Sequence, residues 1–124
     1  AYDKACEELF DALQKIEQSL SEKGPWLCGE KVTLADIRLF PTLIRWEIVY
    51  MPLFGCSQKP LWEFKNLWAW RQRFLNLPNV VNTCDSDSWR KDYFGALFPL
   101  NPSCIVPEGP DLIKMVSSKV PTLP

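Results

Sequence analysis

A complete helix-start signal followed by a nearly continuous apolar run occupies Gly29 to Trp46, and it limits the possible folds more than any other feature of this chain. Thr33 fits the N-cap position. Asp36, three residues later, can accept a hydrogen bond from the Thr33 backbone N–H, which completes a capping box. Val32 and Ile37 occupy the positions of a hydrophobic staple. The sequence therefore predicts a helix capped by Thr33, and loss of the Thr33 hydroxyl should cost about 1 kcal/mol.

The apolar run predicts that this helix is enclosed by other helices. Its apolar side chains surround most of the helix axis instead of forming a single stripe. They are Leu34, Ala35, Ile37, Leu39, Phe40, Leu43 and Ile44. Pro41 removes one main-chain hydrogen bond within the run, so we expect a kink and not a break, because the apolar pattern continues in phase beyond it. The predicted fold class is therefore all-α.

Three further helices are expected around the central one. The first carries one apolar stripe at spacings of three and four residues. The stripe consists of Cys6, Leu9, Leu13, Ile16 and Leu20. Gly24, in a left-handed conformation, and Pro25 should end this helix. A third helix is expected from about Leu61 or Asn66 to Leu75, and a shorter fourth from Ser86 to Phe94.

Proline changes the character of the chain from Pro99 onward. Six of the 11 prolines lie in residues 99–124. Because proline cannot join a regular helix, we expect an extended Pro-rich tail over residues 99–124 beside a helical domain of residues 1–98. Leu97, Phe98, Ile105 and Val106 predict that the first half of the tail is docked. Since the first residue is Ala1 and a helix begins at once, we expect the chain to be part of a longer protein.

The charges and cysteines exclude several functional classes. Fourteen basic and fifteen acidic residues leave a net charge of −1 without a long block of either sign, so neither nucleic acid nor a membrane is an expected partner. The chain has no histidine, and its cysteines are widely spaced, which argues against a metal site and a Cys-His nucleophile. Five free thiols in a reducing compartment are expected. They are Cys6, Cys28, Cys56, Cys84 and Cys104.

Two pairs of aromatic residues are the candidates for a binding site. Trp46 and Tyr50 share one stripe of the central helix, close to the loop that begins near Pro52. Trp89 and Tyr93 form a second pair four residues apart. Two interpretations stay open at this point. The pairs are ordinary core aromatics whose phenols bond to the backbone, or they line a pocket for a flat aromatic ligand that stacks on Trp and hydrogen-bonds to Tyr.

Four segments resemble a known family. WLCGEKVTLADIRLF and LWAWRQRFLNLPNV, in this order and spacing, resemble the C-terminal all-helical domain of glutathione transferases. LIRWEIVYMPLFGC and DYFGALFPLNPSCIVPEGP are more specifically similar to the glutathionyl-hydroquinone reductases, the xi class of these enzymes. The resemblance covers residues 1 to about 110 and implies a glutathione-transferase C-terminal-like helical bundle.

The resemblance also implies roles for individual residues. Tyr50 and Tyr93 fall on the two tyrosines that hydrogen-bond the hydroxyl groups of the substrate, and we expect Trp46 to form an apolar wall beside them. The family's catalytic cysteine and most of its glutathione site lie in an N-terminal thioredoxin-like domain that is absent from this chain, so no catalytic residue is expected here. Cys56 matches a family position, but no cation neighbours it, and we interpret it as a buried or loop thiol. Glutathione is the implied co-substrate and a homodimer the implied assembly.

The chain departs from the family at two places that bear on the substrate. Leu53 to Ser57 replace a His-Phe-Lys-Cys-Asn sequence, and Asp92 replaces a histidine before the last tyrosine. The variant resembles sequences of photosynthetic lineages, so the expected location is intracellular, in the cytoplasm or a plastid. Two alternatives to an enzyme domain remain: a non-catalytic interaction module like those of elongation factor gamma and some aminoacyl-tRNA synthetases, and a ligand carrier without turnover.

Overall fold

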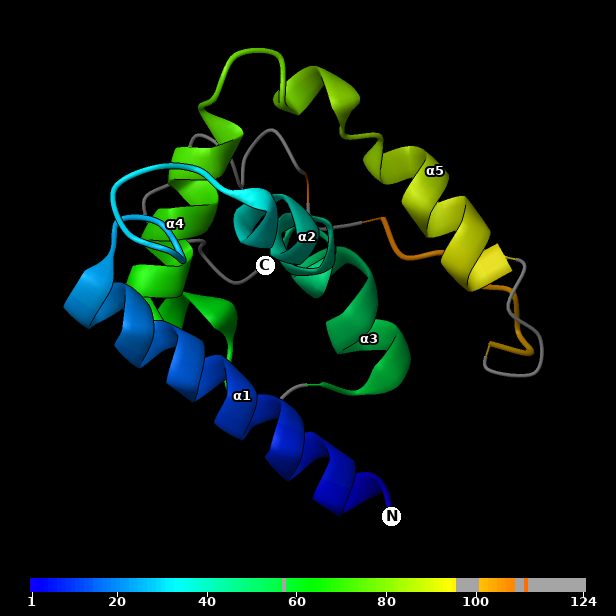
Figure 1. Cartoon of the computed structure of the whole chain (residues 1–124). Coiled ribbons are helices and arrows are strands. Elements are labelled where there is room, and N and C mark those ends of the chain that lie inside the picture. Colours follow the sequence, from blue (N-terminus) through cyan, green and yellow to red (C-terminus); the bar gives the residue numbers. More distant parts are fainter. Residues whose placement is uncertain (57, 96–100, 109–110, 112–124) are drawn as a thin grey trace.

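A computed structural model describes residues 1–56, 58–95, 101–108 and 111 of the chain, and these residues form helices and contain no β-strand (Figure 1). The predicted all-α fold class is confirmed. The α-helices are α1 (Tyr2–Lys23), α2 (Leu34–Ile44), α3 (Met51–Phe54), α4 (Lys65–Leu75) and α5 (Ser86–Arg90). The 3₁₀ turns are η2 (Leu61–Glu63) and η3 (Val81–Thr83), and the π-helical turns are η1 (Trp46–Tyr50) and η4 (Lys91–Gly95). In this described part, no helix is long and apolar enough to cross a membrane.

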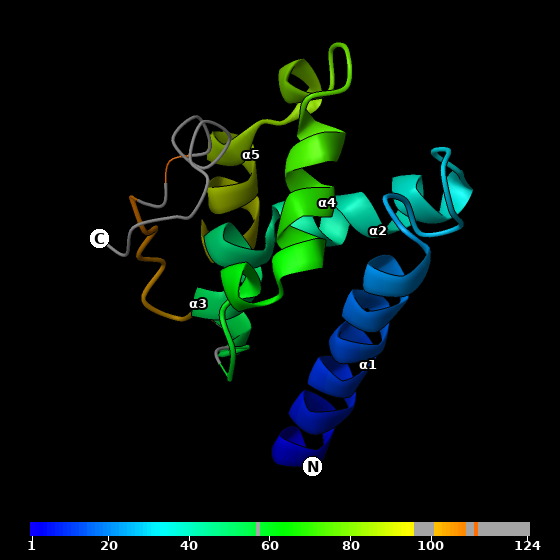
Figure 2. The same cartoon turned by 90° about the vertical axis from the view of Figure 1, so that its left-hand side faces the viewer.

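Helix α2 crosses the middle of the molecule. It runs from the C-terminal end of α1 toward α3 and α5 (Figure 2). Helix α4 contacts both α1 and α2, and α5 contacts the π-helical turn η1 that follows α2. This arrangement places the end of α2 beside α5, which is the side on which both candidate tyrosines lie.

Aromatic side chains form much of the core between α1, α2 and α4. The Phe40 and Phe74 rings stack with their centroids 4.1 Å apart and an interplanar angle of 13°. Phe10 of α1 meets Trp46 edge to face at a centroid distance of 6.0 Å. Stacked and edge-to-face geometries are the two arrangements that aromatic quadrupoles favour. Aromatic contacts therefore connect α1 with the turn that follows α2, and the middle of α2 with α4.

The prediction that α2 is enclosed along its whole length is wrong. Leu34 and Ile37 are 59% and 53% exposed, and Val32 is 37% exposed, so the expected staple residues lie at the surface. Within the same helix Phe40, Leu43 and Ile44 are buried. The first turns of α2 extend beyond the helices that cover its second half. Because apolar side chains occur on all sides of α2, some of those in the first turns remain exposed to solvent.

Gly24 ends α1 as expected, but not in the expected conformation. Its φ of −52° and ψ of −178° are not left-handed. The Gly24 N–H donates to the Leu20 carbonyl at 2.9 Å, and a Cβ at position 24 would lie 2.3 Å from that oxygen. Close backbone approach therefore requires the glycine here. A left-handed glycine does occur at Gly55, where α3 ends with a φ of 66°.

Pro41 does not break α2, which continues through it to Ile44. The chain then stays helical through the π-helical turn η1 to Tyr50, as the in-phase pattern predicted. The loop expected near Pro52 begins later, because Pro52 lies in the first turn of α3, where a proline is tolerated. The expected third and fourth helices also form. Lys65–Leu75 follows a short 3₁₀ turn, and Ser86–Arg90 continues as the π-helical turn η4 to Gly95.

Helix α4 is capped by a side chain from α1. The Glu17 carboxylate accepts hydrogen bonds from the backbone N–H groups of Asn66, at 2.8 Å, and Leu67, at 2.7 Å. Both N–H groups belong to the first turn of α4 and would otherwise lack intrahelical acceptors. A negative charge at a helix N-terminus is also favoured by the helix dipole. This contact fixes α4 against α1 and was not predicted from the sequence.

The segment after η4 is only partly described. The Asn101 side-chain amide donates to the carbonyls of Phe94 at 2.6 Å and Ile105 at 3.0 Å. Ile105 and Val106 are 70% and 39% exposed, so the prediction that they dock is wrong. Asn101 makes the contact instead. Leu97, Phe98, the predicted domain boundary at residue 98 and most of the Pro-rich tail lie outside the described residues.

Candidate functional site

The start of α2 is organised by the buried carboxylate of Asp36. Oδ2 accepts from the Thr33 backbone N–H at 2.9 Å, and the capping box at Thr33 is present. Oδ1 accepts from the Leu27 N–H at 3.0 Å and from Trp70 Nε1 at 2.8 Å. Burial would raise the pKa of Asp36, but these hydrogen bonds to the charged form hold it below its usual value. Asp36 therefore joins three segments of the chain as an ion.

A buried ion pair anchors the other end of α2. Arg71 of α4 donates to Glu47 Oε2 at 2.6 Å and to the Leu43 carbonyl at 2.8 Å. The side chain of Arg71 is fully buried and lies over the Trp68 ring at 4.4 Å. Because both ends of α2 contact α4 through charged groups, the direction of α2 is fixed relative to α4.

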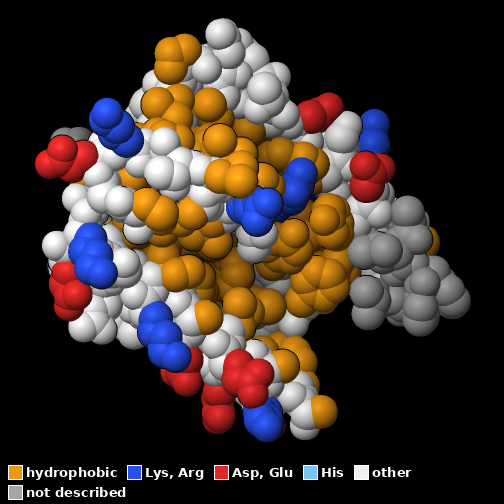
Figure 3. All heavy atoms as spheres, in the orientation of Figure 1, with side chains coloured by type: hydrophobic (Ala, Val, Ile, Leu, Met, Phe, Trp, Pro, Cys, Tyr) orange, Lys and Arg blue, Asp and Glu red, His pale blue; other side chains and the backbone are white. Residues whose placement is uncertain are grey.

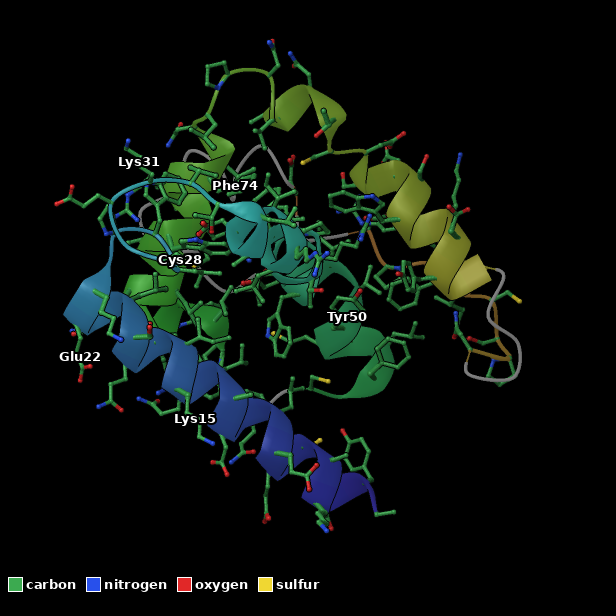
Figure 4. All side chains as sticks on the ribbon, in the orientation of Figure 1. Lys15, Glu22, Cys28, Lys31, Tyr50 and Phe74 are labelled. Atoms are coloured by element: carbon green, nitrogen blue, oxygen red, sulfur yellow. The ribbon has the colours of Figure 1, made fainter. Side chains whose placement is uncertain are left out.

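Both candidate tyrosines lie in π-helical turns. In η1 the N–H groups of Val49 and Tyr50 both donate to the Arg45 carbonyl, at 2.8 and 3.4 Å. Tyr93 lies in η4, which extends α5. Single π-helical turns inside α-helices are rare and are frequently found at functional sites. Figure 4 labels Tyr50 in the stretch where α2 passes into α3.

The structure brings the two tyrosines together. The Tyr50 and Tyr93 rings meet edge to face, with centroids 6.1 Å apart and an interplanar angle of 80°. Tyr50 also stacks on Phe54 of α3 at 5.7 Å. Both phenols are half-buried. We call Tyr50, Tyr93 and the adjoining Arg45 the tyrosine corner. Tyrosines separated by 43 positions in the sequence thus share one place in the fold.

Trp46 lies on the core side of the tyrosine corner. It is only 2% exposed and meets Tyr50 edge to face at 6.4 Å. Its buried Nε1 has no hydrogen-bond partner among the described residues. Trp46 therefore packs against Tyr50 from the core side. Its role as an apolar wall that contacts a ligand stays a prediction.

Arg45 provides the positive charge of the tyrosine corner. Its guanidinium carbon lies 4.9 Å from the centre of the Trp89 ring, a cation–π contact with α5. Burial raises the pKa of Tyr50, and a hydrogen bond with Tyr93 raises it further, whereas the charge of Arg45 and a hydrogen bond with it act in the opposite direction. The net pKa of Tyr50 is above its usual value. We did not select Arg45 from the sequence, although it directly precedes Trp46 in the LIRW motif.

The two partly buried thiols that show a pKa shift are held in the protonated form. Burial raises the pKa of Cys56, and the nearby Cys6 thiol raises it further. Burial also raises the pKa of Cys84, against weaker opposing effects of a hydrogen bond with Thr83 and of the Arg45 charge. A protonated thiol is a poor nucleophile. This agrees with the interpretation of Cys56 as a loop thiol.

Two of the hollows in the surface are lined by described residues, and neither of these two includes Tyr50 or Tyr93. The larger, about 700 Å³, lies at the start of α5 between Cys84, Asp85 and Arg90. The smaller, about 300 Å³, lies between Ile37 and Pro41 of α2 and Pro78. Figure 3 shows apolar side chains spread across the face between α1 and α5. A common cleft at the tyrosine corner therefore stays a prediction.

Comparisons with known proteins agree on one family. The family described as "Glutathione S-transferase, C-terminal domain" matches residues 1–73. The chain is 34% identical over 110 residues to the glutathionyl-hydroquinone reductase YqjG of Escherichia coli, covering 89% of this chain and 33% of that protein. It is 36% identical over 110 residues to the glutathionyl-hydroquinone reductase PcpF of Sphingobium chlorophenolicum, covering 89% of this chain and 35% of that protein.

Solved structures give the same result. The glutathione-bound structure of YqjG matches with a TM-score of 0.84 and 34% identity, over 90% of this chain and 36% of that one. A xi class glutathione transferase from Natrialba magadii matches with a TM-score of 0.83 and 34% identity, over 89% of this chain and 34% of that one. The chain thus spans about a third of the length of the relatives that it matches.

Proposed function

Since the chain belongs to the glutathione S-transferase C-terminal domain family, we propose that it is the substrate-binding domain of a glutathione-dependent thiol transferase or reductase. Its substrates would be glutathionyl-hydroquinones or related aromatic conjugates. The names of two relatives, both glutathionyl-hydroquinone reductases, support this substrate class. Glutathione would be the co-substrate, bound mainly outside this chain. A homodimer formed through the helical domain is the assembly that the resemblance favours.

The observation that carries the proposal is the edge-to-face pair of Tyr50 and Tyr93. In the reaction, a cysteine thiolate outside this chain attacks the glutathione sulfur of the conjugate. The conjugate reacts as its keto tautomer, in which the ring carbon that bears the sulfur is tetrahedral. When the carbon–sulfur bond breaks, its electron pair moves into the ring and places negative charge on a ring oxygen, which takes up a proton to give the hydroquinone. The enzyme is left as a mixed disulfide, and a second glutathione thiolate releases glutathione disulfide from it.

The tyrosines would act on the oxygens of the substrate ring. Each phenol can donate a hydrogen bond to a hydroquinone oxygen, where negative charge develops as the carbon–sulfur bond breaks. A positioned donor of this kind typically contributes a few kcal/mol to the barrier. The raised pKa of Tyr50 suits the role, because the phenol keeps its proton at neutral pH and can donate it in a hydrogen bond.

The proposal is tested by replacing each tyrosine in the full-length protein. Tyr50→Phe and Tyr93→Phe should each lower kcat/KM for a glutathionyl-hydroquinone by about tenfold or more, since each removes one donor and little else. Tyr2→Phe is the matched control: it removes a phenol that donates to the carbonyls of Phe54 and Gly55, outside the tyrosine pair. Equal kcat/KM in all three variants and the parent would contradict the proposal.

The isolated 124-residue chain should not turn over a glutathionyl-hydroquinone. The reaction needs an activated thiolate, and burial keeps Cys56 and Cys84 protonated. Glutathione-dependent release of hydroquinone, followed by absorbance with the purified chain, is the measurement. Turnover by the chain alone would show that the nucleophile lies within it.

One observation favours a second function, a non-catalytic interaction module. The exposed Ile37 lines the 300 Å³ apolar hollow of α2, and Leu34 of the preceding turn is exposed as well. Such patches often mark protein contacts. The tyrosine substitutions separate the two functions, because an interaction module would have no activity for them to change.

A further inference from the structure

Arg45 is held in a fixed position at the tyrosine corner. It occupies the junction between α2 and η1, and its guanidinium lies 4.9 Å from the centre of the Trp89 ring of α5. A cation over an indole ring is stabilised by the ring quadrupole and loses much of its freedom to move. The backbone is fixed as well, because the Arg45 carbonyl accepts from both Val49 and Tyr50. Its position is thus set from two elements.

Part of the hydrogen-bonding capacity of this guanidinium is unused among the described residues. Nε of Arg45 is buried and has no hydrogen-bond partner among the described residues. None of the ion pairs found in the described part of the chain includes Arg45. Glu47, two residues away, is already bonded to Arg71. No carboxylate therefore neutralises Arg45 in this part of the chain.

The charge of Arg45 acts on groups from each neighbouring element. It faces Tyr50 of η1, which in turn contacts Tyr93 of η4. It also acts on Cys84, which precedes α5. The pKa values of Tyr50 and Cys84 are both raised, chiefly by burial, so these two groups carry no negative charge at physiological pH. The tyrosine corner therefore combines phenol hydrogen-bond donors with a positive charge that forms no ion pair with a described carboxylate. The complement of that arrangement is an oxygen that carries negative charge.

We propose that Arg45 determines the specificity of the tyrosine corner, making it selective for aromatic ligands with an ionised hydroxyl group, that is, phenolates. This inference rests on the proposed function, because it names the form of ligand that the same site prefers. The phenolate oxygen accepts hydrogen bonds from the tyrosines, and the half-buried guanidinium stabilises its charge in a medium that screens less than water. A neutral aryl ether of the same shape gains neither benefit.

The test uses two small probes of similar shape, 4-nitrophenol and 4-nitroanisole, with the 124-residue chain. Calorimetric titration is done at a pH at which the nitrophenol is ionised. The chain should bind 4-nitrophenolate about tenfold or more tightly than 4-nitroanisole. Arg45→Gln should abolish this preference and leave the affinity for nitroanisole within about twofold. Arg45→Lys, which keeps the charge, should retain part of the preference.

Two further variants control for charge and for folding. Arg38→Gln removes one positive charge from the exposed surface of the same helix and should leave the preference unchanged. Trp89→Leu removes the ring that holds Arg45 and should reduce the preference even if Arg45→Gln fails to fold. A preference that persists in Arg45→Gln, or in a folded Trp89→Leu when Arg45→Gln is unfolded, would overturn the inference. So would equal binding of the two probes by the parent chain.

The results of this test can be distinguished from those of the test of the proposed function. Suppose the phenolate preference depends on Arg45, while Tyr50→Phe and Tyr93→Phe leave turnover by the full-length protein unchanged. The inference about Arg45 then stands, and the proposed function is wrong. If the tyrosine variants lose turnover but the parent chain binds both probes equally, the proposed function stands and the inference is wrong.

Discussion

The two ends of the continuous helical stretch from Leu34 to Phe54 differ in how their polar groups are used. At the start, the Asp36 carboxylate is fully buried and accepts from donors in three separate segments. At the end, the tyrosine corner is half-buried, and the Arg45 Nε has no partner among the described residues. Buried polar groups whose hydrogen bonds are all made within the protein stabilise the fold, whereas polar groups without a partner in the protein can hydrogen-bond to a ligand. The comparison assigns stability to one end of the stretch and ligand binding to the other.

The largest expected effect is the loss of stability on Asp36→Ala. This substitution leaves Trp70 Nε1 and the N–H groups of Leu27 and Thr33 without their acceptor, at a cost of about 3 kcal/mol in the free energy of unfolding. Urea unfolding followed by circular dichroism measures it. Asp11→Ala, on the exposed face of α1, is the control and should cost less than about 0.5 kcal/mol. Equal losses in the two variants would remove the contrast between the two ends.

Acid should weaken the start of α2 specifically. Because the folded pKa of Asp36 lies below its unfolded value of about 3.9, the charged form contributes stability that is complete above that pH and is lost as the pH falls through the folded pKa. The melting temperature of the parent chain should therefore fall more steeply below about pH 3.9 than that of Asp36→Asn. Parallel curves for the two proteins would show that Asp36 does not contribute as an ion.

A smaller effect is expected for the capping hydroxyl. Thr33→Ala should lower the free energy of unfolding by about 1 kcal/mol, the usual cost of losing an N-cap side chain. Thr33→Ser keeps the hydroxyl, which lies 3.3 Å from Asp36 Oδ2, and should retain most of the stability. Thermal unfolding of the three proteins under the same conditions gives the comparison. A serine variant as unstable as the alanine variant would assign the effect to the methyl group.

The smallest effect on stability is expected at the tyrosine corner. Tyr50→Phe keeps the stacked ring and removes a half-buried hydroxyl, so the free energy of unfolding should change by about 0.5 kcal/mol or less. The same unfolding experiment measures it. A loss greater than that of Thr33→Ala would mean that the Tyr50 hydroxyl holds the fold together, and the functional interpretation of this end would be weakened.

The candidate residues of both ends were selected from the sequence, but their partners were only partly predicted. Thr33 and Asp36 form a capping box within one helical turn, so the local pattern was sufficient. The tyrosine pair was named through the aromatic spacing and the family resemblance. Trp70, which donates to Asp36 from 34 residues away, was not predicted, and neither was the role of Arg45. No spacing rule connects residues that far apart.

The sequence by itself determined the all-α class, the capped start of α2 and the approximate bounds of the other helices. These depend on interactions within a few residues, whose geometry the helical backbone fixes. Only the tertiary structure decided that Leu34 and Ile37 stay exposed, that Glu17 caps α4, and that Tyr50 meets Tyr93 beside Arg45. Those outcomes depend on how helices distant in the sequence pack against one another. The identity of an apolar or charged side chain does not specify which helix will contact it.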